Sequence, residues 1–172
     1  MVNLKVLYDE KTIQNRIQEM ADEIDRDYEG KNILAICVLR GAVYFAVDLT
    51  KKMKNPLVEL DFVRVSSYSG IETTGKIDLQ LDVSEDLTDR DVLIIEDIID
   101  TGYTLKFLKE HILSKNPKSL KIAVLADKEE RRRVPVDVDY VGFKVPSKYI
   151  VGYGFDYNNT CRNLPYIGTL ED

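Results

Sequence analysis

The chain has 172 residues, of which 44% are hydrophobic and 31% charged, and its formal net charge is −6. These values are typical of one globular domain that is large enough for a real core. The acidic balance argues against a general nucleic-acid or membrane-surface binder. A polyanionic small molecule remains possible, because a local basic cluster or a metal can outweigh the global charge.

Two cysteines, Cys37 and Cys161, lie far apart in the sequence and imply no disulfide framework. Residues 1–10 hold no apolar core segment, so no signal peptide is predicted. No apolar run is long enough to span a bilayer. We therefore expect a cytoplasmic protein with a single domain over residues 1–172.

The first part of the chain predicts strand, helix, strand and helix in turn. Residues 2–8 indicate an edge strand, Thr12 is predicted to cap the helix that follows, and Gly30 is well placed to end it. One face of this helix is apolar at helical spacing: Ile13, Ile17, Met20, Ala21 and Ile24. Residues 32–39 predict a buried strand and residues 42–53 a helix, with Leu39-Arg40-Gly41 at the turn between them. On spacing alone, this turn is an ordinary strand-to-helix corner.

A strand is predicted over residues 56–66, and a polar loop flanked by glycines follows it over residues 67–75. The simplest interpretation of this loop is a connector without a functional role. It is much longer than a turn between two strands requires, which makes it a candidate lid. Residues 76–83 alternate between apolar and polar side chains and predict one arm of an antiparallel ribbon.

The most informative stretch is residues 92–104. Its unbroken apolar run predicts a strand buried on both faces of a parallel sheet. We expect the strand to end in an acidic loop with Glu96, Asp97 and Asp100, after which Thr101-Gly102-Tyr103-Thr104 leads into a helix. Ligands of open α/β sheets bind at the carboxyl ends of strands, and a helix start binds phosphate. Carboxylates repel phosphate, so these should face sugar hydroxyls or a divalent cation.

The helix after this stretch holds His111, which we interpret as a structural residue. Residues 120–126 predict another buried strand, with Lys128 at its carboxyl end, where a lysine is usually only solvated. Residues 129–133 are a charge run that indicates a solvated loop, and residues 134–141 indicate a further strand region. Residues 146–157 are rich in aromatic residues and glycine, and by periodicity they indicate only a strand and a turn.

The whole string from Glu96 to Gly102 resembles the phosphoribosyl pyrophosphate (PRPP) signature of the type I phosphoribosyltransferases, in the form of the hypoxanthine-guanine branch. The resemblance runs from Leu39 to Phe155 and beyond, in four separated segments. Leu39-Arg40-Gly41 resembles the pyrophosphate loop, where this branch usually carries lysine; arginine keeps the charge. In the family the peptide bond before the basic residue is often cis, so we expect a cis Leu39–Arg40 bond.

The resemblance also implies the role of each site residue. Asp100 would be the general base, and Glu96 and Asp97 would hold the ribose hydroxyls directly or through Mg²⁺, with Asp156 near the same metal. PRPP would further be bound by Thr101, Gly102, Tyr103 and Thr104, and its pyrophosphate by Arg40, Gly41 and Arg162. The purine would be bound by Lys128, Tyr149, Ile150 and Asp156, and the lid pair would be Ser67 and Tyr68.

The implied fold is an α/β fold with a mostly parallel central sheet flanked by helices. Its core would span about residues 30–145, its flexible lid about residues 66–76, and a small hood about residues 1–10 and 146–172. The implied reaction is purine salvage, in which the 5-phosphoribosyl group of PRPP passes to hypoxanthine or guanine with Mg²⁺ as cofactor. The expected partners are these small molecules, in a homo-oligomer (a dimer or a tetramer), with neither nucleic acid nor membrane.

Other functions fit the sequence less well. A dinucleotide-binding dehydrogenase needs Gly-x-Gly-x-x-Gly after its first strand, and a P-loop NTPase needs Gly-x-x-x-x-Gly-Lys-Ser/Thr; neither is present. The acids do not have the Asp-x-Asp spacing of a phosphatase with an aspartyl nucleophile. A regulator of the same fold, which binds PRPP or a nucleotide without turnover, stays open as the alternative.

Overall fold

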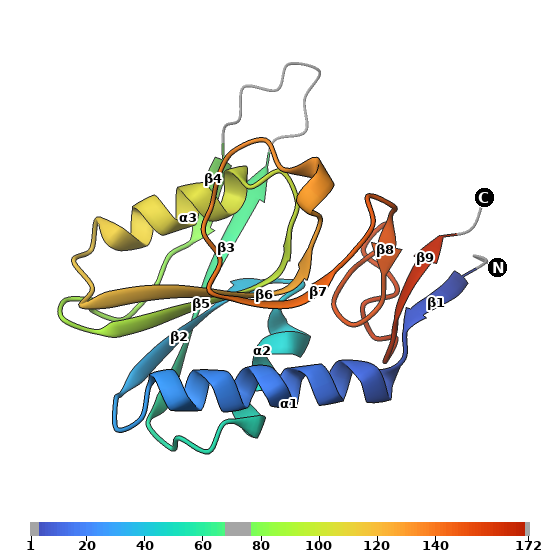
Figure 1. Cartoon of the computed structure of the whole chain (residues 1–172). Coiled ribbons are helices and arrows are strands. Elements are labelled where there is room, and N and C mark those ends of the chain that lie inside the picture. Colours follow the sequence, from blue (N-terminus) through green and yellow to red (C-terminus); the bar gives the residue numbers. More distant parts are fainter. Residues whose placement is uncertain (1–3, 68–76, 171–172) are drawn as a thin grey trace.

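The computed structural model describes residues 4–67 and 77–170 and contains two β-sheets (Figure 1). The strand order is β4-β3-β2-β5-β6-β7 in the larger sheet and β1-β9-β8 in the smaller one. The elements are, in chain order, β1 (Leu4–Tyr8), α1 (Glu10–Asp27), β2 (Ile33–Leu39), α2 (Val43–Lys52), β3 (Val58–Ser67), β4 (Ile77–Leu81), β5 (Asp91–Ile99), α3 (Tyr103–Leu113), β6 (Ser119–Asp127), the 3-10 turn η1 (Glu129–Arg131), β7 (Tyr140–Lys144), β8 (Ile150–Val151) and β9 (Ile167–Leu170). Within the described ranges, no helix is long and apolar enough to cross a membrane.

The larger sheet is mostly parallel. β2 pairs in parallel with β3 and β5, β6 pairs in parallel with β5 and β7, and β4 lies antiparallel to β3 at the edge. Helices α1 and α2 cover one face of this sheet, and α3 covers the other (Figure 1). Because both faces are covered, β2 and most of β5 are buried, as their unbroken apolar runs predict. The predicted α/β fold class is therefore confirmed.

Two sequence-based expectations about elements need correction. The N-cap of α1 is Asp9 and not Thr12: the Asp9 carboxylate accepts a hydrogen bond of 2.8 Å from the Thr12 N–H. Both residues are good caps, and aspartate is further favoured by the positive end of the helix dipole. The strand predicted over residues 134–141 also has the wrong bounds, since β7 begins at Tyr140. The alternating valines there fit a strand period, but Pro135 lacks the N–H that a ladder needs.

The smaller sheet joins the two ends of the chain. β9 pairs antiparallel with both β1 and β8. Tyr8 fixes this sheet to the larger one, because its ring stacks on Phe143 with centroids 4.2 Å apart and its hydroxyl donates to the Lys144 carbonyl at 3.2 Å. A second contact lies at Gly154, where a Cβ would collide with the Gly41 carbonyl oxygen. The smaller sheet and its loops therefore stand beside the turn that follows β2.

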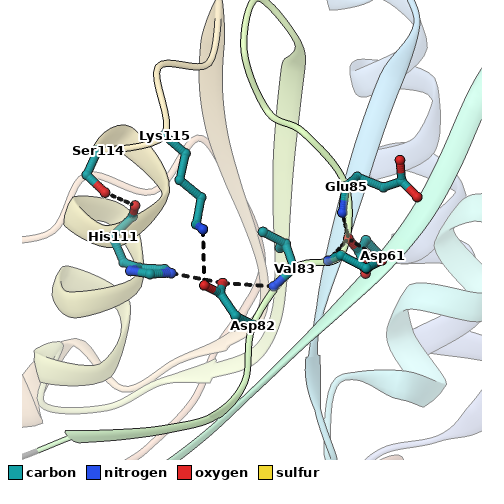
Figure 2. A network of polar contacts seen from close by, with 8 residues as sticks. Asp61, Asp82, Val83, Glu85, His111, Ser114 and Lys115 are labelled. Carbon is teal, nitrogen blue, oxygen red and sulfur yellow. Dashed lines mark hydrogen bonds and ion pairs between the residues drawn. The ribbon is translucent and has the colours of Figure 1, made fainter.

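The connection from β4 to β5 is held by two carboxylates (Figure 2). Asp61 of β3 accepts hydrogen bonds from the N–H groups of Ser84 at 2.8 Å and Glu85 at 3.1 Å. Asp82, directly after β4, lies 2.9 Å from His111 Nε2 and 3.1 Å from Lys115 Nζ. His111 thus has a structural role, as predicted, and ties α3 to the end of β4.

Candidate active site

The strand order creates a crevice between β2 and β5. The chain leaves β2 toward β3 on one side and leaves β5 toward β6 on the other, so the carboxyl ends of these two strands part. The pairing of β2 with β5 stops at Cys37 and Ile95, whereas β5 stays paired with β6 as far as Ile99. Such a switch point is where open α/β sheets bind ligands. Both turns that the sequence singles out, the one after β2 and the one after β5, open at this point.

The acidic pair lies within β5 and not in a loop after it, which corrects the expectation that the strand ends at Glu96. Glu96 is 7% exposed and accepts a hydrogen bond of 2.9 Å from the Asp97 N–H. Burial, and then the neighbouring Asp97 charge, raise the pKa of Glu96 well above its ordinary value. Burial also raises the pKa of Asp97, and the Arg162 charge is among the groups that oppose this rise. Buried acids of this kind favour a cation or hydroxyl donors beside them.

Gly41, Asp97 and Arg162 meet in the crevice although they are far apart in sequence. A Cβ at Gly41 would collide with the Asp97 carboxylate and would lie 3.2 Å from Arg162 Nη1. Glycine therefore allows the turn after β2 to approach the acidic pair. Arg162 forms an ion pair with Asp156 at 2.8 Å and donates to the Gly154 carbonyl at 2.6 Å. The Leu39–Arg40 peptide bond is cis, as expected.

A polar cavity of about 610 Å³ occupies this crevice. Its lining includes many of the predicted site residues: Arg40, Gly41, Glu96, Asp97, Thr104, Asp156 and Arg162. It also includes Arg64, Ser66, Gln80 and Asn159, which the sequence interpretation missed. The β3 strand alternates apolar residues with the polar residues Glu59 and Asp61, so Arg64 does not stand out in its sequence pattern. Three arginines around one cavity suit a polyanionic ligand.

The residues after β5 form a loop at the start of α3 whose backbone suits an anion. Gly102 is the N-cap of this helix, with a φ of 94°, and a Cβ there would lie 2.7 Å from the Val134 carbonyl oxygen. The first N–H groups of a helix have no partner within it and attract anions. Asp100, Thr101, Gly102 and Thr104 line a second cavity of about 160 Å³ together with the acidic pair. The Tyr103 side chain is exposed, so this residue can serve the loop through its backbone.

Lys128 lies beside Asp100 at the end of β6. Its N–H donates to the Ile99 carbonyl at 3.0 Å, and the residue is only 8% exposed, which differs from the usual solvated lysine. The pKa of the Lys128 ammonium is lowered, mainly by burial. The negative charge of Asp100 acts to raise this pKa, and the positive charge of Arg131 acts to lower it further. The charge run after Lys128 is more than a solvated loop, because Arg131 Nε donates to Asp100 Oδ1 at 2.6 Å. No sequence signal distinguishes Arg131 from its neighbours.

The remaining predicted residues lie in or near the smaller sheet, are expected metal ligands, or belong to the expected lid. Tyr149 is exposed and meets Tyr157 edge to face, with centroids 6.1 Å apart, while Ile150 is buried in β8 and pairs with Thr169. Among the described residues, no three metal-ligating side chains gather, so Glu96, Asp97 and Asp156 do not form a three-carboxylate cluster. Ser67 is the last residue of β3, and Tyr68 lies outside the described residues.

Known proteins are similar to this chain in both sequence and fold. Residues 3–158 match the phosphoribosyl transferase domain. The chain is 45% identical to the hypoxanthine-guanine-xanthine phosphoribosyltransferase of Tritrichomonas foetus, over 98% of this chain and 92% of that one. It is also 45% identical to the hypoxanthine-guanine phosphoribosyltransferase of Streptococcus mutans, over 98% and 93% of the two chains. A Bacillus anthracis hypoxanthine-guanine phosphoribosyltransferase, solved with HEPES in its active site, has a TM-score of 0.94 and 44% identity over 99% of this chain and 100% of that one.

The matched region contains both turns of the switch point, the acidic pair and Lys128. Sequence identity over nearly the full length and the same fold thus agree with the crevice described above. The chain belongs to the phosphoribosyl transferase domain family, in its hypoxanthine-guanine phosphoribosyltransferase branch.

Proposed function

We propose that this transferase of purine salvage moves the 5-phosphoribosyl group of PRPP to hypoxanthine and guanine, giving IMP and GMP with release of pyrophosphate. The observation that carries the proposal is the pair formed by Asp100 and the buried Lys128 beside the phosphate loop, held by the Lys128 N–H bond of 3.0 Å to Ile99. An ammonium is a donor that suits the 6-oxo group of a purine, and a carboxylate is an acceptor that suits a proton on N7.

The 5′-phosphate and the pyrophosphate of PRPP are assigned to opposite ends of the crevice. The 5′-phosphate is assigned to the loop from Thr101 to Thr104, where the start of α3 and two hydroxyls favour an anion. The pyrophosphate is assigned to Arg40, Gly41 and Arg162 at the turn after β2. Glu96 and Asp97 lie between these anion sites in the lining of both cavities, and they are assigned to the ribose hydroxyls.

Mg²⁺ is the proposed cofactor, and the donor set fits it. Glu96 and Asp97 are acids with raised pKa values, which a divalent cation would draw into their ionised form. Mg²⁺ in proteins commonly takes one or two carboxylates, several waters and the substrate's phosphates, so a cluster of three carboxylates is unnecessary. Glu96 and Asp97 are the residues proposed to hold it, and Asp156, in the lining of the same cavity, is proposed to lie near it. When bound, the ion supplies positive charge to the leaving pyrophosphate.

The reaction breaks the bond from ribose C1 to pyrophosphate and forms a bond from C1 to purine N9. C1 becomes positive on the way, as in glycoside cleavage. Arg40 and Arg162 stabilise the negative charge that grows on the pyrophosphate. The N7 proton of the purine passes to the Asp100 carboxylate, a transfer typically worth ~10²–10⁴-fold in rate. Ser67 and Tyr68 are proposed to close over the site and keep water away from the cationic carbon.

The purine itself is assigned to a hood made by the smaller sheet and its loops. Tyr149 would stack on the base, and the backbone near Ile150 and Asp156 would meet the 2-position, where hypoxanthine, guanine and xanthine differ. Lys128 disfavours adenine, because a cation opposite an exocyclic amine is a poor match. The name of the Tritrichomonas foetus relative includes xanthine and that of the Streptococcus mutans relative does not, so xanthine is the third base to assay.

We also propose a homo-oligomer, a dimer or a tetramer, in the cytoplasm. Leu60 and Phe62 are 45% and 38% exposed on β3, and their spacing places them on one face of the strand. Tyr44 and Val47 are exposed on α2, directly after the proposed pyrophosphate loop. Large exposed apolar side chains that gather on one side of a protein mark interfaces. Both cysteines are free, in keeping with a reducing compartment.

The role of Asp100 is tested by Asp100→Asn, which keeps the volume of the side chain but removes the proton acceptor. We expect PRPP binding to persist and turnover to fall by ~10²–10⁴-fold. PRPP affinity from calorimetry and nucleotide formation from absorbance separate the two effects. Parental turnover in this variant would refute Asp100 as the base, and a loss of PRPP affinity equal to the loss of turnover would make it a binding residue.

A further inference from the structure

The segment after Lys128 is folded back onto the loop that carries the proposed general base. The N–H groups of Arg133 and Val134 both donate to the Thr101 carbonyl, at 2.9 and 3.2 Å. Arg132 Nε donates to the Asp100 carbonyl at 3.2 Å, and its guanidinium pairs with Asp127. The backbone on both sides of the Asp100–Thr101 bond is therefore fixed by one short segment.

Arg131 is the residue of this segment that reaches the side chain of Asp100. Its Nε donates to Asp100 Oδ1 at 2.6 Å, which is a charge-assisted hydrogen bond. The bond engages one carboxylate oxygen and leaves Oδ2 for another partner. The two side chains are 50% and 36% exposed, so the pair lies at the mouth of the site and not in the core.

Charges of both signs surround Asp100. Lys128 and Arg131 face it from the end of β6 and from η1, while Arg132 meets its carbonyl and is neutralised by Asp127. Glu96 and Asp97, near the end of β5, line the same cavity as Asp100. Of these groups, Arg131 donates a hydrogen bond directly to the Asp100 carboxylate, so it fixes the orientation of that side chain.

We propose that Arg131 is a positioning residue, which holds the Asp100 carboxylate in one orientation and directs its free oxygen toward the N7 proton of the purine. The proposal rests on the function proposed above, because it acts only through Asp100 as the base. Arg131 touches no reacting atom itself. Its contribution is to fix the direction of the lone pairs of the Asp100 carboxylate.

The test compares three substitutions in the full-length enzyme. Arg131→Gln removes the charge, Arg131→Lys keeps it, and Arg133→Gln is the matched control. Arg133 lies on the same segment with an exposed side chain, and its contact with Thr101 is made by its backbone N–H, which the substitution keeps. The measurements are kcat and KM for hypoxanthine at saturating PRPP, made in the parent background and in the Asp100→Asn background.

In Arg131→Gln we expect kcat to fall by roughly three- to tenfold, the scale for a partly exposed charged pair, while KM for hypoxanthine stays at the parental value. In the Asp100→Asn background the same substitution should cause little further loss, because Arg131 acts only through the Asp100 carboxylate. Arg131→Lys should recover most of the loss of kcat, and Arg133→Gln should match the parent.

If Arg131→Gln lowers kcat by the same factor in the Asp100→Asn background as in the parent, the proposal is overturned, since a purely structural role predicts that result. If Arg131→Gln does not fold, Arg131→Lys decides: it keeps the charge but not the planar guanidinium, and a loss of kcat that persists in the Asp100→Asn background overturns the idea. Failure of the function is distinct, because then the parent forms no nucleotide or Asp100→Asn retains parental turnover.

Discussion

At Gly41 the turn after β2 passes so close to the acidic pair that a methyl group would collide with the Asp97 carboxylate. The backbone of Gly41 does not need the left-handed region, so alanine would strain the site and not the turn itself. We expect Gly41→Ala to weaken PRPP binding by about 1–3 kcal/mol, roughly 5- to 150-fold, because the crowded carboxylate and Arg162 must shift. Calorimetric titration with PRPP measures this loss.

Gly30→Ala is the matched control for that measurement. Gly30 has a φ of 71° and open space around its would-be Cβ, the reverse of the situation at Gly41. Alanine there should lower the free energy of unfolding by about 1 kcal/mol and leave PRPP affinity at the parental value. Equal PRPP affinity in the two variants would show that the contact between Gly41 and Asp97 does not shape the crevice.

Single residues were predictable from the sequence where a motif fixes the local backbone. Arg40, Gly41 and Asp100 follow directly after strands, and the structure places all three at the switch point. Arg64 and Arg131 were not predictable in this way. Their positions depend on which strands are neighbours and on how η1 folds back, and no local pattern contains that information.

At the level of elements, Asp82 connects β4 to α3 (Figure 2). Burial alone would raise the pKa of Asp82, but hydrogen bonds from His111, Lys115 and the Val83 N–H outweigh it and lower the pKa. A carboxyl group with a lowered folded pKa adds stability above its unfolded pKa, about 3.9, and loses that contribution as the pH falls through the folded pKa.

We therefore expect Asp82→Asn to reduce the free energy of unfolding by ~0.5–1 kcal/mol at about pH 7, a value limited by solvent around the pair. The difference from the parent should shrink toward zero as the pH falls through the lowered folded pKa of Asp82, because below it both states of the parent carry a protonated Asp82. Urea unfolding at several pH values measures this difference in the free energy of unfolding. Asp78→Asn, an exposed carboxylate on the same β4 strand, is the control, and equal effects of both substitutions at all pH values would contradict the connection.

The sequence predicted elements well where one pattern dominates. The apolar runs of β2 and β5 and the five-residue apolar face of α1 are buried as expected. It failed over residues 134–139, where valines alternate but Pro135 interrupts the ladder, and β7 starts only at Tyr140. It also ended β5 too early, because strand pairing with β6 keeps Glu96 and Asp97 within the sheet.

Across the whole molecule, the parallel sheet was predictable because strands and helices alternate along the chain. The pairing of β1 with β9 was not, since it joins Leu4 to Leu170 and neither short strand has a decisive pattern of its own. The position of the smaller sheet follows from contacts such as Tyr8 on Phe143, which only the folded chain brings together.

The proposed oligomer is also tested at this scale. An interface with twofold symmetry buries each side chain twice, and covering one phenylalanine contributes about 1.5–3 kcal/mol. Phe62→Glu should therefore convert the parental oligomer to monomer in sedimentation velocity. Leu113→Glu, at an exposed apolar position on the end of α3, should leave the oligomer intact. A parental sedimentation coefficient for Phe62→Glu would exclude this side of β3 from the interface.

The most direct test of the function is nucleotide formation from PRPP and Mg²⁺ with hypoxanthine, guanine, xanthine or adenine as the acceptor. Lys128 beside Asp100 predicts turnover with hypoxanthine and guanine and little with adenine, and the rank of xanthine defines how the 2-position is recognised. PRPP binding without turnover of any base would contradict the proposed transferase and favour a PRPP sensor. Adenine as the preferred acceptor would contradict the role assigned to Lys128.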